Sequence, residues 1–305
     1  MSTRILHVSD LHLGAPKATR EATFGPALAA LVERLDPALV IATGDLTHRG
    51  RAEQHVAAAE FLRGLGRPLL VVPGNHDVPY SLPGRLTHPW REFYRCWTTT
   101  EPVHSSPELQ AVGLNSARPL LHQGGRIGRA QLERAADRLA EGAPGALRIA
   151  AFHHQLLGAP WRSRKRPLAR RSPVLARLRD AGAELVIGGH IHQAAISAAQ
   201  EFELAPASAL VTTAPGLGRP RPRRRGEACG ALAYIVDEET IVVETHLWRQ
   251  PAFELCASRR FPRGAGRLAG DRLAGAEGDS HDPAHDPGLH GGAERVGAPH
   301  ARPQA

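Results

Sequence analysis

Five short segments place His, Asp or Asn directly after a run of apolar residues. They are Asp10-Leu11-His12, Gly44-Asp45, Gly74-Asn75-His76-Asp77, His153-His154 and Gly189-His190-Ile191-His192. Each preceding run is typical of a strand, so the polar side chains are expected at strand ends, where α/β folds place functional groups. Neutral imidazole and carboxylate together suit Mn, Fe, Zn or Co. The pattern therefore predicts a transition-metal site.

The spacing within the segments supports this interpretation. Residues i and i+2 of an extended strand point to the same side, so Asp10 can share a site with His12, and His190 with His192. Glycine precedes three of the polar positions, where it allows a sharp turn. A single histidine of this kind is more often a packed or hydrogen-bonded residue, but five segments in order favour a functional site.

The elements that must position these residues follow an α/β pattern. Apolar runs bounded by turn residues predict strands at 4–9, 38–42, 68–72, 109–114, 146–152 and 184–188. Apolar residues at helical spacing predict helices at 23–35, 51–65, 128–141 and 172–182. After Gly189 the helical pattern stops and further strands are expected at 194–204, 208–213, 230–237 and 240–248. These later strands predict a second, antiparallel block, and hence two sheets.

Composition and charge restrict the class of protein. The hydrophobic fraction of 42% is enough for a buried core, but no run approaches the roughly 18 apolar residues of a membrane helix, so no membrane partner is expected. The net charge is +8, and of the 38 basic residues all are arginine except Lys17 and Lys165. This excess favours an anionic substrate or partner, or else reflects a compositional bias towards arginine.

The cysteines and the first residues indicate the compartment. Cys96, Cys229 and Cys256 are odd in number, widely spaced and outside any CxxC pattern, which predicts a reduced protein without disulfides. The apolar run that follows Arg4 is too short for a signal peptide. A cytoplasmic location is therefore expected.

The composition changes at Pro262. The last 44 residues contain nine glycines, five prolines and no aromatic residue. A segment with so little apolar surface cannot offset the entropy of ordering its chain. We therefore expect one catalytic domain over residues 1–261 and a low-complexity, disordered tail over residues 262–305.

The five segments together resemble the calcineurin-like metallophosphoesterase superfamily, whose pattern is D-x-H, G-D, G-N-H-[DE], a later H and G-H-x-H. All five blocks occur in this order between residues 10 and 192. The resemblance extends to the bacterial branch related to class III cyclic-nucleotide phosphodiesterases and includes Asn115-Ser116-Ala117-Arg118. It covers about residues 4–250 and implies a four-layer α/β/β/α sandwich of two mixed sheets flanked by helices.

The resemblance implies a ligand set for two divalent or trivalent transition-metal ions, such as Mn, Fe or Zn. One ion would be held by Asp10, His12 and His192, and the other by Asn75, His153 and His190, with Asp45 between them. His153 is chosen over His154 because the family's ligand is the first histidine of the pair. Gln155 stands where many members have proline, so both histidines stay candidates.

The resemblance also implies groups that act on the substrate. His76 would protonate the leaving oxygen or stabilise the transferring phosphoryl group. Asp77 would either orient His76 or cap a helix. Candidates for binding the substrate phosphate are Arg49, Arg118 and Arg223, with solvated loops as the alternative for the arginine-rich runs.

The reaction implied is hydrolysis of a phosphoester, most directly a nucleotide-type or other small phosphodiester, by a hydroxide bridging two ions. His48 stands where protein phosphatases have aspartate, which argues against that class. A DNA-repair nuclease of the same superfamily stays an alternative, although the chain lacks a long capping region, and nucleic acid stays open as a partner. A non-catalytic scaffold is disfavoured because no ligand is missing. Metal identity and oligomeric state are left open.

Overall fold

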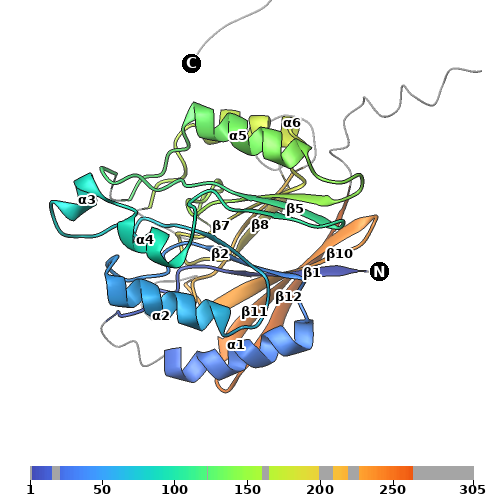
Figure 1. Cartoon of the computed structure of the whole chain (residues 1–305). Helices are drawn as coiled ribbons and strands as arrows, with labels where there is room; N and C mark the ends of the chain where they lie inside the picture. The colour runs from blue at the N-terminus through green and yellow to red at the C-terminus, as the bar shows by residue number, and fades with distance from the viewer. Residues whose placement is uncertain are drawn as a thin grey trace, which may run out of the picture. The chain divides into compact units, whose positions relative to one another are not determined.

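The structure is a computed structural model that describes residues 2–15, 21–121, 123–159, 165–198, 209–218 and 227–263 (Figure 1). The expectations for Arg223, for Lys17 and for the tail beyond Arg263 lie outside the described residues. The chain divides into two units, Met1–Leu268 and Ala269–Ala305. The fold described below belongs to the first unit.

The first of two six-stranded mixed sheets has the strand order β12-β11-β10-β1-β2-β3. Its strands are β1 (Thr3–Val8), β2 (Leu39–Thr43), β3 (Leu69–Val72), β10 (Gly230–Val236), β11 (Thr240–Arg249) and β12 (Ala252–Pro262). Strands β1, β2 and β3 run parallel, whereas β10 is antiparallel to β1 and pairs Tyr234 with Ile5. The N-terminal strand is therefore central to the sheet.

The second sheet has the order β4-β5-β6-β7-β9-β8. Its strands are β4 (Val103–Ser105), β5 (Leu109–Gly113), β6 (Leu147–Ala151), β7 (Leu185–Gly188), β8 (Ala195–Ala198) and β9 (Leu210–Thr213). The four central strands are parallel and the two edge strands are antiparallel. The carboxyl ends of β6 and β7 therefore lie at the same edge of this sheet.

Helices cover the outer face of each sheet, as Figure 1 shows, with α1 and α2 on one side and α5 and α6 on the other. The helices are α1 (Glu21–Leu35), α2 (Ala52–Arg63), α3 (Gly84–Thr87), α4 (Arg91–Cys96), α5 (Arg129–Ala140) and α6 (Arg171–Asp180). Three buried apolar clusters separate the layers: one under α1 and α2, one between the sheets, and one under α5 and α6. The expected four-layer sandwich is confirmed.

The strands are apolar on both faces because both faces are covered. In β1, Ile5 belongs to the cluster between the sheets, and the next residue, Leu6, belongs to the cluster under the helices. In β2, Ile41 and Val40 divide in the same way. Successive side chains of a strand point to opposite faces, so a strand buried on both sides needs an uninterrupted apolar run. This is the signal that made these strands predictable.

The later strands correct one expectation. They do not form a block of their own, because β10, β11 and β12 extend the first sheet from β1, and β8 and β9 complete the second. No pattern in the sequence indicated β4, α3, α4 or β12. Most side chains of β12 are exposed, so the strand lacks the apolar pattern of a buried one. Beyond Ala198, the strand expected over 194–204 lies outside the described residues.

Strand β12 ends at Pro262, and the next residue is held in the fold. Arg263 Nε lies 3.1 Å from Glu184 Oε2, and both side chains are nearly buried. The domain boundary at residue 261 and the tail beyond it stay predictions. No helix of the described ranges is both long and apolar enough to cross a membrane.

A buried chain of hydrogen bonds runs from His7 in the first sheet through Tyr234 to the second sheet. His7 Nε2 lies 2.9 Å from Thr43 Oγ1, and His7 Nδ1 lies 3.0 Å from the Tyr234 hydroxyl. That hydroxyl is 2.6 Å from Thr212 Oγ1 in β9 of the second sheet. Burial lowers the pKa of His7 to about 3, and Asp10 opposes the shift only in part. The folded protein therefore keeps this imidazole neutral.

This lowered pKa predicts acid sensitivity of the metal-free protein. Below about pH 6.5 the unfolded chain binds a proton at His7 that the folded protein does not bind until about pH 3. Between these values, His7 should lower the free energy of unfolding by about 1.4 kcal/mol for each pH unit of acidification. Urea unfolding at several pH values checks this prediction. In His7→Asn, the free energy of unfolding should change less steeply with pH, by an amount that corresponds to about one bound proton. An unchanged slope would contradict the buried neutral state.

Candidate metal centre

All five polar segments lie where a parallel strand of one of the two sheets has just ended. Asp10 and His12 follow β1, Asp45 follows β2, Asn75, His76 and Asp77 follow β3, His153 follows β6, and His190 and His192 follow β7. The segments come from both sheets, yet their side chains meet in one buried group. The carboxyl edges of the two sheets therefore build one site.

The first cluster consists of Asp10, His12 and His192, which offer ligand atoms within 4.8 Å of one another. His192 Nε2 lies 3.0 Å from Asp10 Oδ1 and 3.1 Å from His12 Nε2. All three side chains are buried. One carboxylate oxygen and two imidazole nitrogens thus converge on a common point.

The second cluster consists of Asp45, His153 and His190. His153 Nε2 lies 3.4 Å from Asp45 Oδ1 and 3.0 Å from His190 Nδ1. The side-chain oxygen of Asn75 lies 3.1 Å from the same nitrogen. This cluster therefore offers two nitrogen and two oxygen atoms.

Asp45 adjoins both clusters. Its Oδ1 is the atom near His153, and its Oδ2 lies 3.8 Å from His12 Nε2 in the first cluster. This is the placement that a carboxylate shared by two cations requires. Among the described residues, Asp45 Oδ2 and Asp10 Oδ1 are buried and accept no hydrogen bond. Buried carboxylate oxygens without donors are costly, so these atoms fit cation binding.

Hydrogen bonds from neighbouring groups orient the ligand atoms. His153 Nδ1 donates to the carbonyl oxygen of Thr43 at 2.8 Å, which leaves the lone pair of Nε2 facing the cluster. Asp10 Oδ2 accepts from the Ser9 hydroxyl at 2.7 Å and from the His190 amide at 2.9 Å. Only Asp10 Oδ1 is then free to face the first cluster.

The backbone conformation of the site differs from the expected one. Five of the proposed ligands have positive φ angles, namely Asp10 (54°), His12 (48°), Asp45 (49°), His190 (76°) and His192 (57°). Left-handed conformations are strained for residues with a Cβ atom and cluster at functional sites. Asp10 and His12 share the first cluster, as expected. The extended-strand reason for that expectation is wrong, because β1 ends at Val8 and β7 at Gly188. His190 and His192, in contrast, lie in different clusters.

Gly44 is required by close packing of two loops. It has φ +82°, and a Cβ atom there would lie 2.5 Å from the amide nitrogen of Gly74. Glycine therefore allows the loop that carries Asp45 to approach the loop that carries Asn75.

The electrostatics of the clusters favour a cation. Burial alone would raise the pKa of the Asp10 carboxyl, but the imidazoles of His192 and His153 outweigh it and hold this pKa well below its ordinary value. The pKa of Asp45 is lowered in the same way, chiefly by His153 and His76 against burial. Burial would lower the pKa of His153, but Asp45 raises it to about 9. Two ionised carboxylates therefore lie in a dry site that attracts positive charge.

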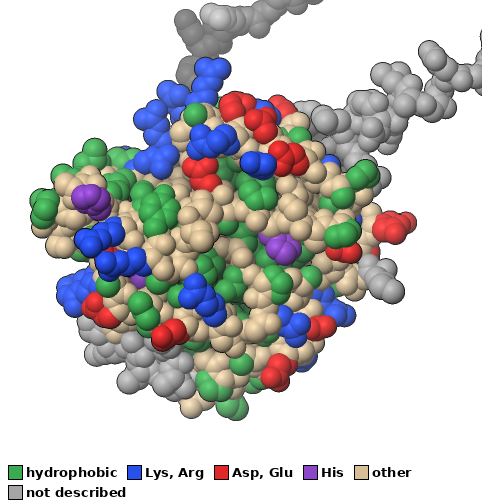
Figure 2. All heavy atoms as spheres, viewed as in Figure 1, with side chains coloured by type: hydrophobic (Ala, Val, Ile, Leu, Met, Phe, Trp, Pro, Cys, Tyr) green, Lys and Arg blue, Asp and Glu red, His purple; other side chains and the backbone are tan. Residues whose placement is uncertain are grey.

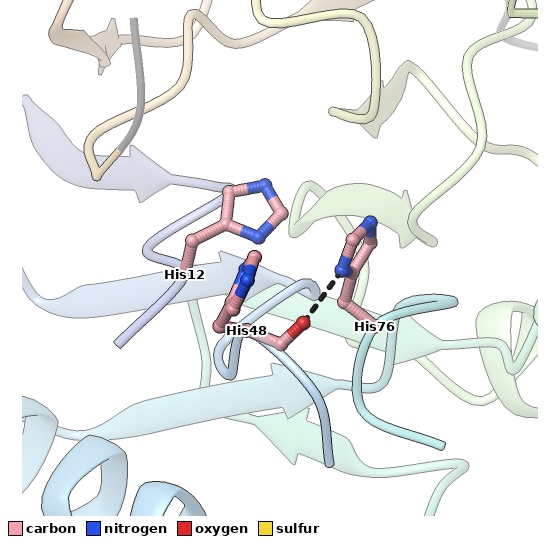
Figure 3. Close-up of side chains that lie close together, drawn as sticks. All are labelled: His12, His48 and His76. Atoms are coloured by element: carbon pink, nitrogen blue, oxygen red, sulfur yellow. Dashed lines mark hydrogen bonds between the residues drawn. The ribbon is translucent and has the colours of Figure 1, made fainter. Parts of the chain in front are cut away.

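His76 lies beside His12 of the first cluster, as Figure 3 shows. Its Nδ1 donates to the carbonyl oxygen of His48 at 2.8 Å, which leaves Nε2 as the second functional atom of the ring. The ring meets that of His12 edge to face, with 4.7 Å between centroids. The hydroxyl of Tyr80 lies 3.0 Å from Nδ1. His76 is thus held from two sides without belonging to the first or the second cluster.

Sequence reasoning missed two neighbours of His76. His48 entered only as an argument against protein phosphatases, yet its carbonyl fixes His76 and its ring stacks on that of His76 with 6.1 Å between centroids. His48 lies three residues after Asp45, so a search for histidines close to the Gly44-Asp45 motif could have found it. Tyr80 follows no motif, and nothing in the sequence marks it.

Asp77 ties two loops together. Its carboxylate accepts hydrogen bonds from the amides of Thr47 at 2.9 Å, Leu46 at 3.2 Å and Gly74 at 2.8 Å. The hydrogen bond of the His76 ring goes to His48 instead. Asp77 therefore supports the loops that carry Asp45 and Asn75.

The remaining candidates do not belong to either cluster, although the ring of His154 packs against that of His190 with 4.5 Å between centroids. His154 turns its Nδ1 to the Ser116 hydroxyl at 2.9 Å and joins neither ligand cluster, so geometry favours its neighbour His153. The guanidinium of Arg118 donates to the carbonyl oxygens of Asn115 and Ala117. Arg49 is exposed beside His48.

Comparison with known proteins agrees with the resemblance found in the sequence. A model of the calcineurin-like phosphoesterase family matches residues 3–194, a range that contains every proposed ligand. A probable cyclic nucleotide phosphodiesterase of Synechococcus sp. is 30% identical over 159 residues, which cover 50% of this chain and 58% of that relative. The chain thus spans little more than half the length of that curated relative.

Two solved structures share the fold. A dimetal phosphatase from Danio rerio has a TM-score of 0.60 at 13% identity, with 86% of this chain and 99% of that chain covered. The structure of PhoD has a TM-score of 0.62 at 10% identity, with 86% of this chain and 70% of that chain covered. At such low sequence identity, these likenesses show a shared fold.

Proposed function

The chain belongs to the calcineurin-like phosphoesterase family, and from this membership we propose that it is a dinuclear metal-dependent phosphodiesterase acting on nucleotide-type or other small phosphodiesters. The observation that carries the proposal is the position of Asp45, whose two oxygens adjoin two separate sets of buried ligand atoms. A single-metal site would need only one such set.

The residues present fit two transition-metal ions. Asp10, His12 and His192 would hold one, and Asn75, His153 and His190 the other, with Asp45 contributing to both. The mixture of imidazole nitrogens and few carboxylates suits Mn, Fe or Zn better than Ca or Mg. When bound, two such ions supply a nucleophile at neutral pH and stabilise negative charge on the phosphoryl group.

The protein's own residues would protonate the leaving oxygen and hold the groups that do so. His76 keeps the proton of Nδ1 in its bond to the His48 carbonyl, so Nε2 is the atom that would give a proton to the leaving oxygen. Asp77 holds the loop on which His76 lies. The buried walls of the site exclude water from the ligand atoms, which strengthens their interaction with charge.

The charge of the site favours an anionic phosphoester. Two carboxylates do not neutralise two divalent or trivalent ions, so the loaded centre would stay positive and attract the anionic phosphate. The net charge of +8 acts in the same direction. The relative from Synechococcus, a probable cyclic nucleotide phosphodiesterase, supports a nucleotide-type substrate. A cytoplasmic location stays a prediction.

Metal analysis and a substrate panel test the proposal. We expect two transition-metal ions per chain and faster hydrolysis of bis(p-nitrophenyl) phosphate than of p-nitrophenyl phosphate. Cyclic nucleotides, a linear dinucleotide and single-stranded DNA complete the panel and separate small diesters from nucleic acid. A chain that binds no more than one ion and hydrolyses none of these compounds would rule the proposal out.

Asn75 offers a prediction with an internal control. Its side-chain oxygen adjoins only the second cluster. Asn75→Ala should therefore weaken the binding of one ion and leave the binding of the other unchanged. We expect an affinity loss of at least about 10–100-fold for that ion, the usual cost of losing even a supporting group. Activity should return in part when Mn²⁺ is raised well above the protein concentration.

The matched control is Asn115→Ala. Asn115 is the only other asparagine of the chain, is also buried, and bonds the amide of Ala117 outside both clusters. Calorimetric titration with Mn²⁺ should show two ions for the Asn115 variant. If the Asn75 variant loses both ions, or regains no activity at any Mn²⁺ concentration, its assignment to a single ion is wrong.

A further inference from the structure

A pocket of about 950 Å³ opens beside His76, between the start of α2 and the segment that carries α3 and α4. Its lining includes Arg49, Arg51, Pro79, Tyr80, His88 and Arg91. Figure 2 shows basic and histidine side chains gathered over the region of α3 and α4, on the left of the view. This volume is large enough for a group the size of a nucleotide.

The pocket is continuous with the surroundings of His76. The Tyr80 hydroxyl, which belongs to the pocket wall, lies 3.0 Å from His76 Nδ1 and 3.4 Å from His76 Nε2. Arg49 follows His48, whose carbonyl accepts the hydrogen bond of the same nitrogen. A substrate whose leaving oxygen reaches His76 would therefore extend its leaving half towards this pocket.

The wall is held in place by Arg85. Its Nε donates to the carbonyl oxygen of Pro119 at 2.7 Å, and another guanidinium nitrogen donates to that of Pro79 at 3.1 Å. The guanidinium also lies over the ring of Tyr80, 5.9 Å from its centroid. The side of the pocket that carries Tyr80 is therefore preorganised.

The charge of the pocket is positive. Its two carboxylates are opposed by arginines: Glu53 lies 3.8 Å from Arg51, and Glu92 lies 3.8 Å from Arg91 and 2.6 Å from Arg95. The guanidinium of Arg49 makes neither a hydrogen bond nor an ion pair with any described residue. Arginine binds phosphate through two parallel hydrogen bonds, so such a lining suits a phosphate group.

We propose that this pocket binds the leaving half of a linear phosphodiester and that this half carries a second phosphate. The inference rests on the proposed function, because it takes His76 to face the leaving oxygen. Water adds to phosphorus, the bond to the leaving oxygen breaks, and that oxygen departs with a proton, together with the half bound in the pocket. A cyclic nucleotide has no separate leaving half, so the pocket favours linear dinucleotides with a terminal phosphate.

The test compares dinucleotides that differ in one phosphate. The full chain loaded with Mn²⁺ is assayed on thymidylyl-thymidine without a terminal phosphate, with a 5′-phosphate and with a 3′-phosphate. For one of the two phosphorylated isomers we expect kcat/KM about tenfold above that of the unphosphorylated compound, as charge-assisted hydrogen bonds permit. The preference should shrink as NaCl is raised, because the pocket is open to solvent.

Two variants locate the preference. Arg91→Glu should bring the ratio of the two kcat/KM values to one or below, and Arg91→Ala should give an intermediate ratio. Arg129→Glu is the matched control, because Arg129 is also an exposed arginine at the first residue of a helix, α5, but does not line the pocket. It should keep the wild-type ratio.

Each outcome decides one proposal. In one outcome, the wild-type protein hydrolyses thymidylyl-thymidine but shows kcat/KM values for both phosphorylated isomers within twofold of that for the unphosphorylated compound. This result would overturn the pocket proposal and leave the proposed function standing. If the ratio of kcat/KM values falls as much in Arg129→Glu as in Arg91→Glu, the pocket is not the source of the preference, and the pocket proposal is wrong. If the metal-loaded protein hydrolyses no diester at all, the proposed function fails and the pocket proposal fails with it.

Discussion

Replacing Asp45 with alanine is expected to abolish phosphodiester hydrolysis and to remove most of the bound metal. Among the described residues, Asp45 is the one carboxylate whose oxygens adjoin both clusters, at 3.4 Å from His153 Nε2 and 3.8 Å from His12 Nε2. Its loss would leave buried imidazoles without the negative charge that offsets two cations. We expect fewer than one ion per chain and turnover at the level of the buffer, measured by elemental analysis and by bis(p-nitrophenyl) phosphate hydrolysis.

A second variant separates charge from shape. Asp45→Asn keeps the size of the side chain and an acceptor for the amide of His76, which Asp45 Oδ1 binds at 2.8 Å, but removes the charge. It should fold and still lose metal. Asp36→Ala, at a surface ion pair with Arg67, controls for removing an aspartate and should retain both ions. Two ions in the Asp45→Asn protein would refute the shared role.

His76→Ala is expected to keep both ions and to lose about 10²–10⁴-fold in kcat, the usual contribution of general acid catalysis. The ring lies next to the first cluster but outside the two sets of ligand atoms that contain Asp10 and Asp45. The loss should shrink for a diester with p-nitrophenolate as leaving group, since this group leaves without a proton. Rates on that diester and on a dinucleotide, together with metal content, check the prediction.

The pattern of losses distinguishes the roles open to His76. Equal losses for good and poor leaving groups would show that the ring stabilises the phosphoryl oxygens in the transition state. Loss of an ion would make it a ligand, in line with its position within 4.8 Å of nitrogen atoms of His12 and His48. Tyr80→Phe removes a neighbouring hydroxyl and serves as a milder control.

Much of the fold could be predicted because its central strands are buried on both faces. Such strands need uninterrupted apolar runs, as in Leu39–Thr43, and turn residues end them. Strand β12 has mostly exposed side chains and could not be recognised in this way. The pairing of β10 with β1 joins residues more than two hundred positions apart, and nothing local in the sequence encodes it.

The site was predicted by residue type and by resemblance, and less well by geometry. The segments containing Asp10, Asp45 and His190 were placed correctly at strand ends, but their alignment comes from left-handed backbone conformations that spacing alone does not reveal. Tyr80 and the pocket depend on how loops from separate elements pack together. Such contacts arise only in three dimensions.

The five left-handed ligand residues set a conflict between heat resistance and activity. A residue with a Cβ atom pays about 1–2 kcal/mol for this conformation, and glycine does not. Selection of the metal-free chain for thermal stability would therefore enrich glycine at Asp10, His12, Asp45, His190 and His192. Such selection would yield robust but inactive proteins, so directed evolution of this scaffold should be carried out with metal present and activity as part of the screen.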